Sequence, residues 1–240
     1  MNDLTVGAVV LCRLDSQRLP GKVMADVLGR PLLWYVLTRC FAVASIGQVI
    51  VATSDRAVDD PIYEYCASQG IRVFRGPGEN VAGRMLFCAE DAGLDYFFRI
   101  NADSPCLEPW LLEKAVAQIG ERNWDFITNL YPRSFPYGVS VELIKSATYR
   151  KIYPSILQSG QREHPTQYLY QHLDLLIWRN IIREGKDLSS TRLTVDTVED
   201  LVWFRNLAVK TQDRWSSIGH EEIVANYCEL RVKPELTRKD

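Results

Sequence analysis

Three cationic side chains lie within ten residues of the stretch VVLCRLDSQRLPGKVM, directly after an apolar run. They are Arg13, Arg18 and Lys22, and the chain bends between them at Pro20 and Gly21. Arginine binds phosphate oxygens through paired hydrogen bonds and lysine binds them as a point charge, so we expect this loop to hold a polyphosphate. The loop matches neither the Walker pattern G-x-x-x-x-G-K-[ST] nor the dinucleotide pattern G-x-G-x-x-G. A solvated basic loop is the alternative interpretation.

Two aspartates are candidates for holding the metal ion that a bound triphosphate requires. Asp103 follows the apolar residues of RINADSP, and Asp196 follows those of RLTVDTVED. A hard divalent cation prefers oxygen ligands, commonly one or two carboxylates together with phosphate oxygens. For each aspartate alone a local role is the first interpretation: Asp103 as a turn or N-cap residue, and Asp196 as a helix N-cap whose capping box Glu199 completes. Their occurrence together with the cationic loop favours metal binding.

Strands and helices alternate through the first half of the chain. Short valine-rich runs indicate strands buried on both faces, and apolar residues at helical spacing indicate helices. We expect strands at residues 6–11, 48–53, 71–74, 96–101 and 125–129, and helices at residues 32–41, 60–69, 81–92 and 109–120. This alternation predicts an α/β fold whose mostly parallel sheet carries helices on both faces and binds ligands at the carboxyl ends of its strands.

The pattern changes at about Tyr131. YPRSFPYG places two prolines and a glycine among aromatic residues, and the segment to about Lys186 is interpreted as a lid, a substrate lobe or a dimer arm. Within and after it we expect strands at residues 138–144 and 192–196 and helices at residues 147–158, 198–209 and 221–230. The chain is expected to form one domain, with a nucleotide-binding part at about 1–130, a lobe at about 131–190 and closing elements at about 191–240.

Composition narrows the class of protein. The 240 residues are 47% hydrophobic and 24% charged, which is typical of a globular protein with one substantial core. The net charge of −2 excludes a global field that recruits nucleic acid or an anionic membrane. Six widely spaced cysteines without a C-x-x-C pair predict a reduced, cytoplasmic protein, and the spacing of the three histidines does not favour zinc. No stretch approaches the ~20 apolar residues of a membrane span, so we expect neither secretion nor membrane insertion.

The stretch CRLDSQRLPGKVM resembles the opening signature of the nucleotide-sugar cytidylyltransferases, [AC]-R-x-x-S-x-R-[LF]-P-G-K, and GRPLL resembles the G-x-P-[LM] that follows it. Five further stretches occur in the family's order: ATSD, GENVAGR, NADSP, REHPTQY and VDTVEDL. The chain from about residue 5 to 210 is similar to the branch named for spore-coat polysaccharide synthesis. That branch is related to the synthetases that activate acylneuraminate and 3-deoxy-manno-octulosonate sugars with CTP. The opening signature is highly specific, and the later stretches are individually weak.

The resemblance implies the nucleotide-diphosphosugar-transferase fold, which is GT-A-like, and the reaction of CTP with a sugar to give CMP-sugar and pyrophosphate, with Mg²⁺ as cofactor. It implies catalytic roles for Lys22, Arg18 and Asp103, of which the two cations would contact the β- and γ-phosphates. The resemblance also implies that Asp103 is the principal metal ligand and Asp196 the second. The implied nucleotide-binding residues are Leu11, Arg13, Ser16, Arg18, Lys22, Asn80, Arg84 and Asp103, with Arg13 and Ser16 at the phosphates and Asn80 and Arg84 near base and ribose.

The expected acceptor is an acidic nonulosonate or ulosonate-type sugar for a surface polysaccharide. Glu142, Glu163 and His164 are the candidate sugar-binding residues, and the two glutamates are also candidate general bases. Glu142 is equally well interpreted as a solvent-facing strand residue, and His164 as the start of a helix. Cys12, and Ala102 and Ser104 within NADSP, depart from the family's commoner residues and leave the sugar open.

A homodimer is expected because the excursion is rich in the aromatic residues that are enriched at interface cores, and related synthetases often pair two subunits through it. The aromatic residues concerned are Phe135, Tyr137, Tyr149, Tyr153, Tyr168 and Tyr170. Two other functions stay open. A glycosyltransferase of the same fold would use a nucleotide-sugar donor, although three cations suit a triphosphate better. A non-enzymatic nucleotide-binding module would not need the paired carboxylates.

Overall fold

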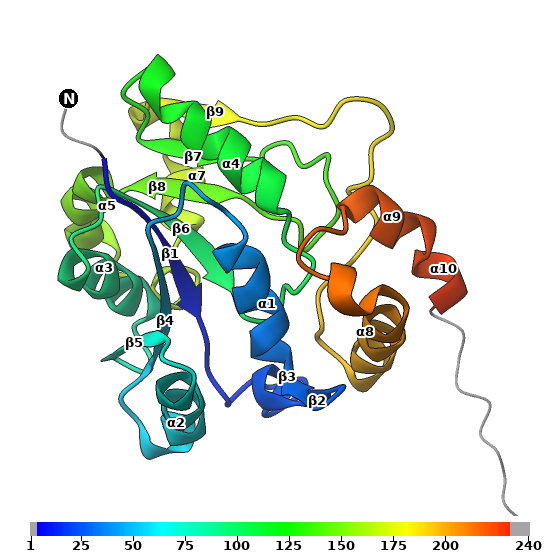
Figure 1. Cartoon of the computed structure of the whole chain (residues 1–240). Coiled ribbons are helices and arrows are strands. Elements are labelled where there is room, and N and C mark those ends of the chain that lie inside the picture. The colour runs from blue at the N-terminus through cyan, green and yellow to red at the C-terminus, as the bar shows by residue number, and fades with distance from the viewer. Residues whose placement is uncertain (1–3, 231–240) are drawn as a thin grey trace, which may run out of the picture.

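A seven-stranded sheet in the order β5-β4-β1-β6-β8-β7-β9 forms the centre of the protein, and a short β2-β3 hairpin lies apart from it (Figure 1). The computed structural model describes residues 4–230. The strands are β1 (Val6–Leu11), β2 (Asp26–Val27), β3 (Arg30–Pro31), β4 (Gln48–Ser54), β5 (Arg72–Gly76), β6 (Tyr96–Asn101), β7 (Phe126–Thr128), β8 (Glu142–Lys145) and β9 (Trp178–Asn180). The predicted α/β fold with a mostly parallel sheet is confirmed.

Parallel pairing brings the carboxyl ends of the central strands to one edge of the sheet. β1 pairs in parallel with both β4 and β6, and Leu11 at its end lies opposite Ala52 and Asn101. β8 runs antiparallel to its neighbours β6 and β7, so its first residue, Glu142, lies at this same edge opposite Thr128. This edge, here called the carboxyl edge, is where a doubly wound sheet binds its ligand.

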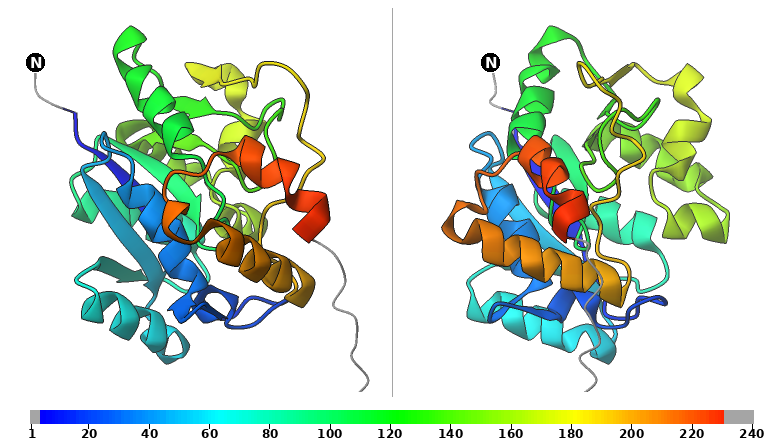
Figure 2. Two further views of the ribbon diagram at one scale, coloured as in Figure 1. Left: turned by 45° about the vertical axis from the view of Figure 1, so that its right-hand side comes forward. Right: turned by 90° about the vertical axis from the view of Figure 1, so that its right-hand side faces the viewer.

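Helices cover both faces of the sheet, as two views in Figure 2 show. Buried apolar residues of α1, α2, α4 and α8 form one core cluster, and those of α3, α5 and α7 form the other. The helices are α1 (Leu32–Phe41), α2 (Asp60–Ser68), α3 (Val81–Asp91), α4 (Pro109–Ala117), α5 (Ser146–Ile152), α6 (Ser159–Glu163), α7 (Gln167–Gln171), α8 (Val198–Thr211), α9 (His220–Ala225) and α10 (Tyr227–Leu230). Both sheet faces are therefore buried, which explains why β1 is apolar at every position.

The expected strand at residues 192–196 is wrong. Leu193 and Val195 are buried, as the alternating pattern predicts, but their backbone N–H groups donate to the carbonyl oxygens of Tyr137 and Asp103 on two different segments. No ladder forms, and Arg192 makes only an isolated bridge. The helix expected over residues 147–158 ends at Ile152 and is followed by a 3₁₀ turn that contains a proline, and the one expected over 221–230 is divided into α9 and α10.

Buried hydrogen bonds from Arg39 of α1 hold the segment between α8 and α9 against α1. The Arg39 guanidinium is fully buried and donates hydrogen bonds to the carbonyl oxygens of Leu107, Trp215 (2.6 Å) and Ile218 (2.8 Å). Beside it the Glu108 carboxylate lies 2.9 Å from a ring nitrogen of His220, at the start of α9. Because buried polar groups are costly without partners, this network fixes where the segment after α8 returns to the core.

The cysteines expected to be reduced are free and buried at positions 12, 40, 66, 88 and 106, and the side chain of Cys228 lies outside the described part. Burial raises the pKa of the Cys40 and Cys106 thiols to about 12, so these thiols pack as small apolar groups. No helix among residues 4–230 is long and apolar enough to cross a membrane.

Candidate active site

The cationic loop leaves the carboxyl end of β1 and is closed at its base by backbone hydrogen bonds. The Leu14 carbonyl accepts the Gly21 N–H at 2.8 Å, and Gly21 in turn accepts from the Met24 N–H at 2.9 Å. Gly21 has a φ of +73°, a left-handed conformation that favours glycine. The bend predicted at Pro20 and Gly21 therefore turns the chain back so that Lys22 points inward, where it begins a 3₁₀ turn.

Lys22 lies between the two predicted metal ligands. Its ammonium group is 2.7 Å from a carboxylate oxygen of Asp103 and 2.9 Å from one of Asp196. The Lys22 side chain is only 7% exposed, whereas the Arg18 side chain is 63% exposed. A solvated basic loop thus describes Arg18 but not Lys22, and residues from three distant parts of the sequence meet at the carboxyl edge.

Asp196 gathers three cationic side chains around one buried carboxylate. Arg18 and Lys22 donate to one oxygen, the former at 2.7 Å, while Arg192 and the Thr194 hydroxyl donate to the other. Burial opposes the charge of Asp196, but the hydrogen bonds from Lys22 and Arg192 outweigh it and hold the pKa of the carboxyl well below its ordinary value. Arg192 is a member of this cluster that the sequence analysis missed.

The N-cap of α8 is Thr197 and not Asp196. The Thr197 hydroxyl accepts the Asp200 N–H at 3.2 Å, and the Asp200 carboxylate accepts the Thr197 N–H at 3.0 Å. This reciprocal pair is a capping box shifted by one residue from the expected Asp196 and Glu199. The side chain of Asp196 is consequently directed to the cationic cluster.

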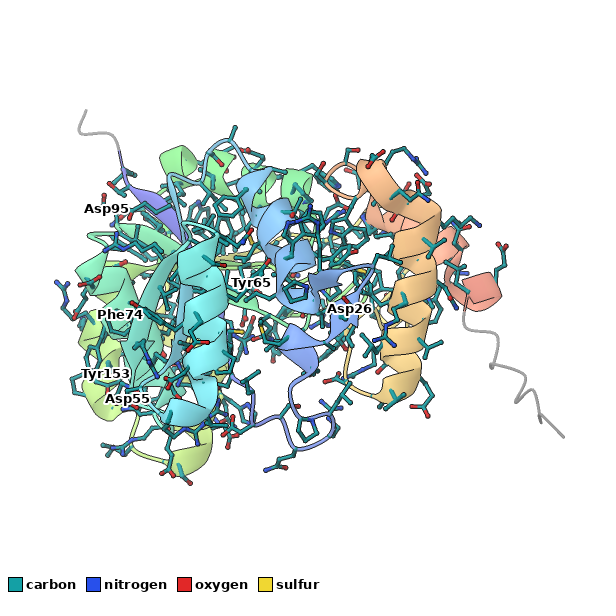
Figure 3. All side chains as sticks on the ribbon, turned by 60° about the horizontal axis from the view of Figure 1, so that its bottom comes forward. Asp26, Asp55, Tyr65, Phe74, Asp95 and Tyr153 are labelled. Carbon is teal, nitrogen blue, oxygen red and sulfur yellow. The ribbon has the colours of Figure 1, made fainter. Side chains whose placement is uncertain are left out.

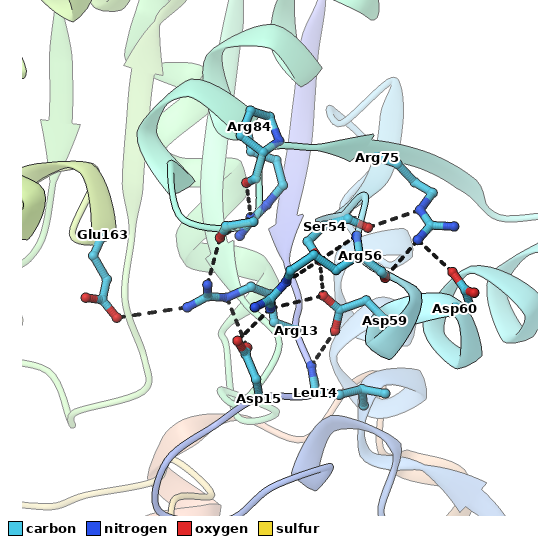
Figure 4. Close-up of polar contacts among 12 residues, drawn as sticks. Arg13, Leu14, Asp15, Ser54, Arg56, Asp59, Asp60, Arg75, Arg84 and Glu163 are labelled. Carbon is cyan, nitrogen blue, oxygen red and sulfur yellow. Dashed lines mark hydrogen bonds and ion pairs between the residues drawn. The ribbon is translucent and has the colours of Figure 1, made fainter.

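Arg13 and Arg84 converge on the loop that joins β5 to α3 (Figure 4). Arg13 donates to the Gly78 carbonyl at 2.7 Å, and Arg84 donates to the Pro77 carbonyl at 2.7 Å and more weakly to Gly78. Burial and the nearby charge of Arg13 lower the pKa of Arg84 to about 10. Arg13 and Arg84 thus connect the loop between β5 and α3 to the base of the cationic loop.

Asn80 caps the helix that carries Arg84. Its side-chain oxygen accepts the Gly83 N–H at 2.9 Å, and its amide donates to the Tyr153 hydroxyl at 2.8 Å. Both groups of the Asn80 side chain are therefore used within the protein. Leu11 and Ser16, the remaining predicted nucleotide-binding residues, are half-buried at the end of β1 and in the cationic loop.

A polar row crosses the sheet at Arg99, Glu142 and Thr128. Arg99 donates to Glu142 at 2.8 Å, and the Tyr170 hydroxyl of α7 lies 2.7 Å from that of Thr128. Glu142 is 1% exposed, so the solvent-facing interpretation is wrong. Burial opposes the charge of Arg99, yet Glu142 and, more weakly, Asp103 raise its pKa. One Glu142 oxygen and the Arg99 Nε are buried without a hydrogen-bond partner among the described residues, which is unusual in a native core.

Arg133 is a second cation that the sequence analysis did not select. It is half-buried with its guanidinium 4.8 Å from the ring centroid of Tyr137, and Arg192 lies 4.4 Å from the same ring. Burial lowers the pKa of Arg133, and its hydrogen bonds to the Pro136 carbonyl (3.3 Å) and the Ser140 hydroxyl (3.5 Å) are long. Arg133 belongs to the aromatic stretch YPRSFPYG, which has no periodicity, so no pattern in the sequence selected it.

Glu163 and His164 are exposed at the end of α6. The Glu163 carboxylate is 3.9 Å from Arg13, and His164 follows the last residue of the helix, so the helix-start interpretation is wrong. Glu163 is therefore placed near the carboxyl edge by its contact with Arg13, and neither side chain is held in place by burial.

The donor set suits a magnesium ion that is completed by phosphate oxygens. Among the described residues no group of three or more His, Cys, Asp or Glu side chains forms a complete metal site. Magnesium is typically bound by one or two carboxylates together with substrate phosphates and water. Asp103 and Asp196 converge on one point, and one Asp103 oxygen contacts only the Ser104 hydroxyl at 3.2 Å. The two carboxylates therefore fit a divalent cation that a triphosphate brings with it.

A cavity of about 570 Å³ lies at the opposite edge of the sheet, away from the clustered charges. Its walls include Leu4, Asp95 and Lys145, and Figure 3 shows Asp95 and Asp55 at opposite ends of the sheet. The orientation of the parallel strands and the buried charges favour the carboxyl edge.

A cationic loop and paired carboxylates at the carboxyl edge of an α/β sheet define the class as nucleotidyltransferase. The sequence profile described as Cytidylyltransferase matches residues 8–214, so the chain belongs to that family and is an enzyme that uses CTP. SpsF, the spore coat polysaccharide biosynthesis protein of Bacillus subtilis, is 29% identical over 222 residues, 89% of this chain and 90% of that protein. A 3-deoxy-manno-octulosonate cytidylyltransferase of Geobacter sulfurreducens is 28% identical over 120 residues, 49% of this chain and 46% of that enzyme.

Solved structures share the fold. A cytidylyltransferase of Leptospira borgpetersenii has a TM-score of 0.88 at 24% identity, with 94% of each chain covered. The CMP:2-keto-3-deoxy-manno-octonic acid synthetase complexed with CTP has a TM-score of 0.65 at 18% identity, with 86% of this chain and 99% of that one covered. The fold expected from the resemblance is therefore confirmed.

The lowered pKa of Asp196 makes a pH-dependent contribution to stability. A carboxyl with a depressed folded-state pKa stabilises the fold above the ordinary carboxyl pKa of about 4, and this is lost as pH falls through the lower folded value. We expect Asp196→Asn to be less stable than wild type near neutral pH, with a difference that shrinks below about pH 4. Urea unfolding across pH, with Asp213→Asn at the exposed surface as control, measures this. A difference that stays constant or grows in acid would contradict it.

Proposed function

We propose that this enzyme transfers the cytidylyl group of CTP to a hydroxyl of an acidic sugar. The sugar oxygen forms a bond to the α-phosphorus, and the bond from that phosphorus to the bridging oxygen breaks, so that pyrophosphate leaves with the electron pair. The hydroxyl proton passes to a general base, for which Glu142 and Glu163 are the candidates. The observation that carries the proposal is the meeting of Lys22, Asp103 and Asp196 at the carboxyl edge. Membership of the cytidylyltransferase family supplies the nucleotide.

Arg18 and Lys22 are proposed to bind the β- and γ-phosphates. Negative charge grows on the leaving pyrophosphate as the reaction proceeds, so fixed cations there stabilise the transition state more than bound CTP. Lys22 is held rigidly between carboxylates, while the exposed Arg18 can follow the leaving group. Arg13 and Ser16, at the base of the same loop, are proposed to contact the phosphates nearer the nucleoside.

Asp103 and Asp196 are proposed to hold Mg²⁺. When bound, this ion supplies positive charge that neutralises phosphate oxygens and orients them for in-line displacement. Asp103 is the better ligand because its side chain is 26% exposed and one oxygen is lightly used, whereas Asp196 already accepts from three cations. Asp196 also orients Arg18, Lys22 and Arg192, so its role extends beyond the metal.

The loop from β5 to α3 is proposed to receive the base and ribose, with Leu11 at the neighbouring strand end. Arg84 and Asn80 were assigned to this function by the resemblance. Since the Asn80 side chain caps α3 and the Arg84 guanidinium donates to Pro77 and Gly78, both are proposed to act by shaping this loop. The base is then read by the loop backbone that these two residues fix.

An acidic acceptor is supported by the charge of the region beside Tyr137. Arg99 is neutralised by Glu142, but Arg133 is half-buried and forms no ion pair with a carboxylate of the described residues. A partly buried cation is stabilised by an anion, and a sugar carboxylate supplies one. In the polar row Arg99, whose side chain is partly exposed, is proposed to contact the sugar hydroxyls, and the buried Glu142 is proposed to act on the sugar by holding Arg99 in place. Glu163 and His164 are proposed to contact the acceptor from the lobe.

A glycosyltransferase function is the weaker alternative, because the family match is to enzymes that consume CTP and the loop presents cations for a triphosphate. A non-enzymatic nucleotide-binding module is also weaker, because it would not need the paired carboxylates. Synthesis of a CMP-sugar for a surface polysaccharide is proposed from the likeness to SpsF. A cytoplasmic location is proposed because the reaction needs CTP and the buried cysteines are free.

A two-fold dimer is proposed through the sheet edge at β9, although its support differs from that expected. Of the six aromatic residues on which the expectation rested, Phe135 and Tyr149 are core residues and only Tyr137 is exposed. The new support is an edge strand flanked by exposed apolar side chains at Leu175 and Ile177.

Asp103→Asn tests the metal assignment. Asparagine keeps the size and one acceptor but loses the charge that a hard cation requires, so turnover should be abolished while CTP affinity stays within roughly tenfold of wild type. Calorimetry with and without Mg²⁺, together with pyrophosphate release, measures both effects, and Asp213→Asn is the surface control. Normal turnover by Asp103→Asn, or by wild type in excess chelator, would refute metal-dependent cytidylyl transfer.

The acceptor is tested with a panel of sugars and with Arg133→Gln. Wild type is expected to release pyrophosphate with an acidic sugar, such as 3-deoxy-manno-octulosonate or N-acetylneuraminate, and not with neutral hexoses. Arg133→Gln should raise the KM for the acidic sugar about tenfold or more, as expected for one charge-assisted hydrogen bond, and leave the KM for CTP nearly unchanged. Arg122→Gln, at the opposite edge, is the control. Equal pyrophosphate release with neutral and acidic sugars would contradict the proposal of an acidic acceptor.

Light scattering tests the assembly. Wild type should have twice the chain mass of 27.5 kDa at micromolar concentration. Ile177→Lys should weaken the dimer because it places a charge in the apolar patch, whereas Val209→Lys on α8 should not. A wild-type mass of one chain would end the dimer proposal.

A further inference from the structure

The segment that follows β4 contacts the base of the cationic loop through one buried carboxylate. Asp59 is completely buried, and one of its oxygens accepts the Leu14 N–H at 2.7 Å. Its other oxygen accepts the Ser54 hydroxyl, as Figure 4 shows. Because β4 pairs directly with β1, this contact joins the carboxyl ends of two neighbouring strands.

Leu14 is the residue at which the loop both begins and closes. Its N–H is fixed by Asp59, and its carbonyl accepts the Gly21 N–H. Arg18 lies inside the ring that this second bond closes, and Lys22 follows it directly. A displacement of Leu14 would therefore move both cations relative to the sheet.

A second contact from the same segment restrains the next loop residue. Arg56 donates to Asp15 at 2.5 Å and lies 3.7 Å from Asp59. This ion pair is more than one-third exposed on both sides, so it contributes little by itself. The buried bond to Leu14 is the directional one, since a buried carboxylate persists only when its oxygens are hydrogen-bonded.

We propose that Asp59 is a positioning residue that sets the cationic loop for triphosphate binding. It acts through the Leu14 backbone and contacts neither nucleotide nor metal. The inference rests on the proposed function, because it takes Arg18 and Lys22 as the groups that bind the β- and γ-phosphates. A purely structural Asp59 would stabilise the fold without favouring one nucleotide over another.

The ratio of CTP affinity to CMP affinity separates these roles. CMP lacks the β- and γ-phosphates, so a displaced loop weakens CTP binding and leaves CMP binding almost unchanged. General destabilisation changes both affinities together. The two Kd values, measured by calorimetry on the full chain with Mg²⁺, give this ratio directly.

The variants are Asp59→Ala, Asp59→Asn and the control Asp60→Ala. Asp60 is the adjacent residue of the same type, but it is partly exposed and pairs with Arg75 at 2.7 Å. Asp59→Ala removes the acceptor and should lower the CTP:CMP affinity ratio about tenfold, in keeping with loss of a charge-assisted hydrogen bond. Asp59→Asn keeps an oxygen for the Leu14 N–H, so its affinity ratio should stay within about threefold of the wild-type ratio. The ratio of Asp60→Ala should stay within the same range.

Each outcome decides the matter. An unchanged ratio in Asp59→Ala, an equal fall in Asp60→Ala, or an Asp59→Asn variant as impaired as Asp59→Ala overturns the proposal. Should the alanine variant fail to fold, Asp59→Ser, whose hydroxyl is too short to reach Leu14, is read in the same way. If wild type binds CMP as tightly as CTP, and Arg18→Ala leaves the Kd for CTP unchanged, then the phosphate-binding role of the cationic loop and this inference are both refuted. A wild-type preference for CTP that survives Asp59→Ala refutes this inference alone.

Discussion

The buried contact of the Lys22 ammonium with the Asp103 and Asp196 carboxylates is the constraint on which the site depends. These residues come from the loop after β1, the turn after β6 and the segment before α8. Removing Asp196 would leave the buried Lys22 ammonium with Asp103 as its one remaining ion-pair partner among the described residues, and the loss of a partner is destabilising for a buried charge. The sheet, the cationic loop and the closing helices must therefore assemble together. The parallel pairing of β1 with β6 makes this possible, because it brings two of the three segments to one edge.

The groups that neutralise each other here are the same ones assigned to the substrate and its metal. In our proposal Lys22 and Arg18 would bind phosphate oxygens, and Asp103 and Asp196 would hold Mg²⁺. At the acceptor end the ion pair between Arg99 and Glu142 likewise places charged groups beside the proposed sugar site.

The central sheet and the chemistry of the loop were predictable because their signals are local. Continuous apolar runs identified β1, β4 and β6. The opening signature selected Lys22 and the stretch RINADSP selected Asp103, and the fold brings these two residues into contact. The sequence was less informative where partners are distant. Alternation at residues 192–196 correctly indicated which side chains are buried, but periodicity does not reveal that their backbone partners belong to two separate segments.

Other members of the site had no local signal at all. Arg133 and Arg192 lie in irregular segments where charged residues follow no periodic pattern. Asp59 has the sequence context of an ordinary residue at the start of a helix. Their significance is their burial and their contacts across long sequence separations. The shift of the capping box by one residue, from Asp196 to Thr197, likewise depended on the path of the chain into α8.

A crystal structure of the enzyme with CTP and Mg²⁺ tests the central claim most directly. The account predicts a triphosphate at the carboxyl edge, with the Lys22 ammonium and the Arg18 guanidinium on the β- and γ-phosphates and Asp103 bound to the metal ion. A triphosphate bound elsewhere, or one bound while Lys22 remains between the two carboxylates without a phosphate contact, would contradict it.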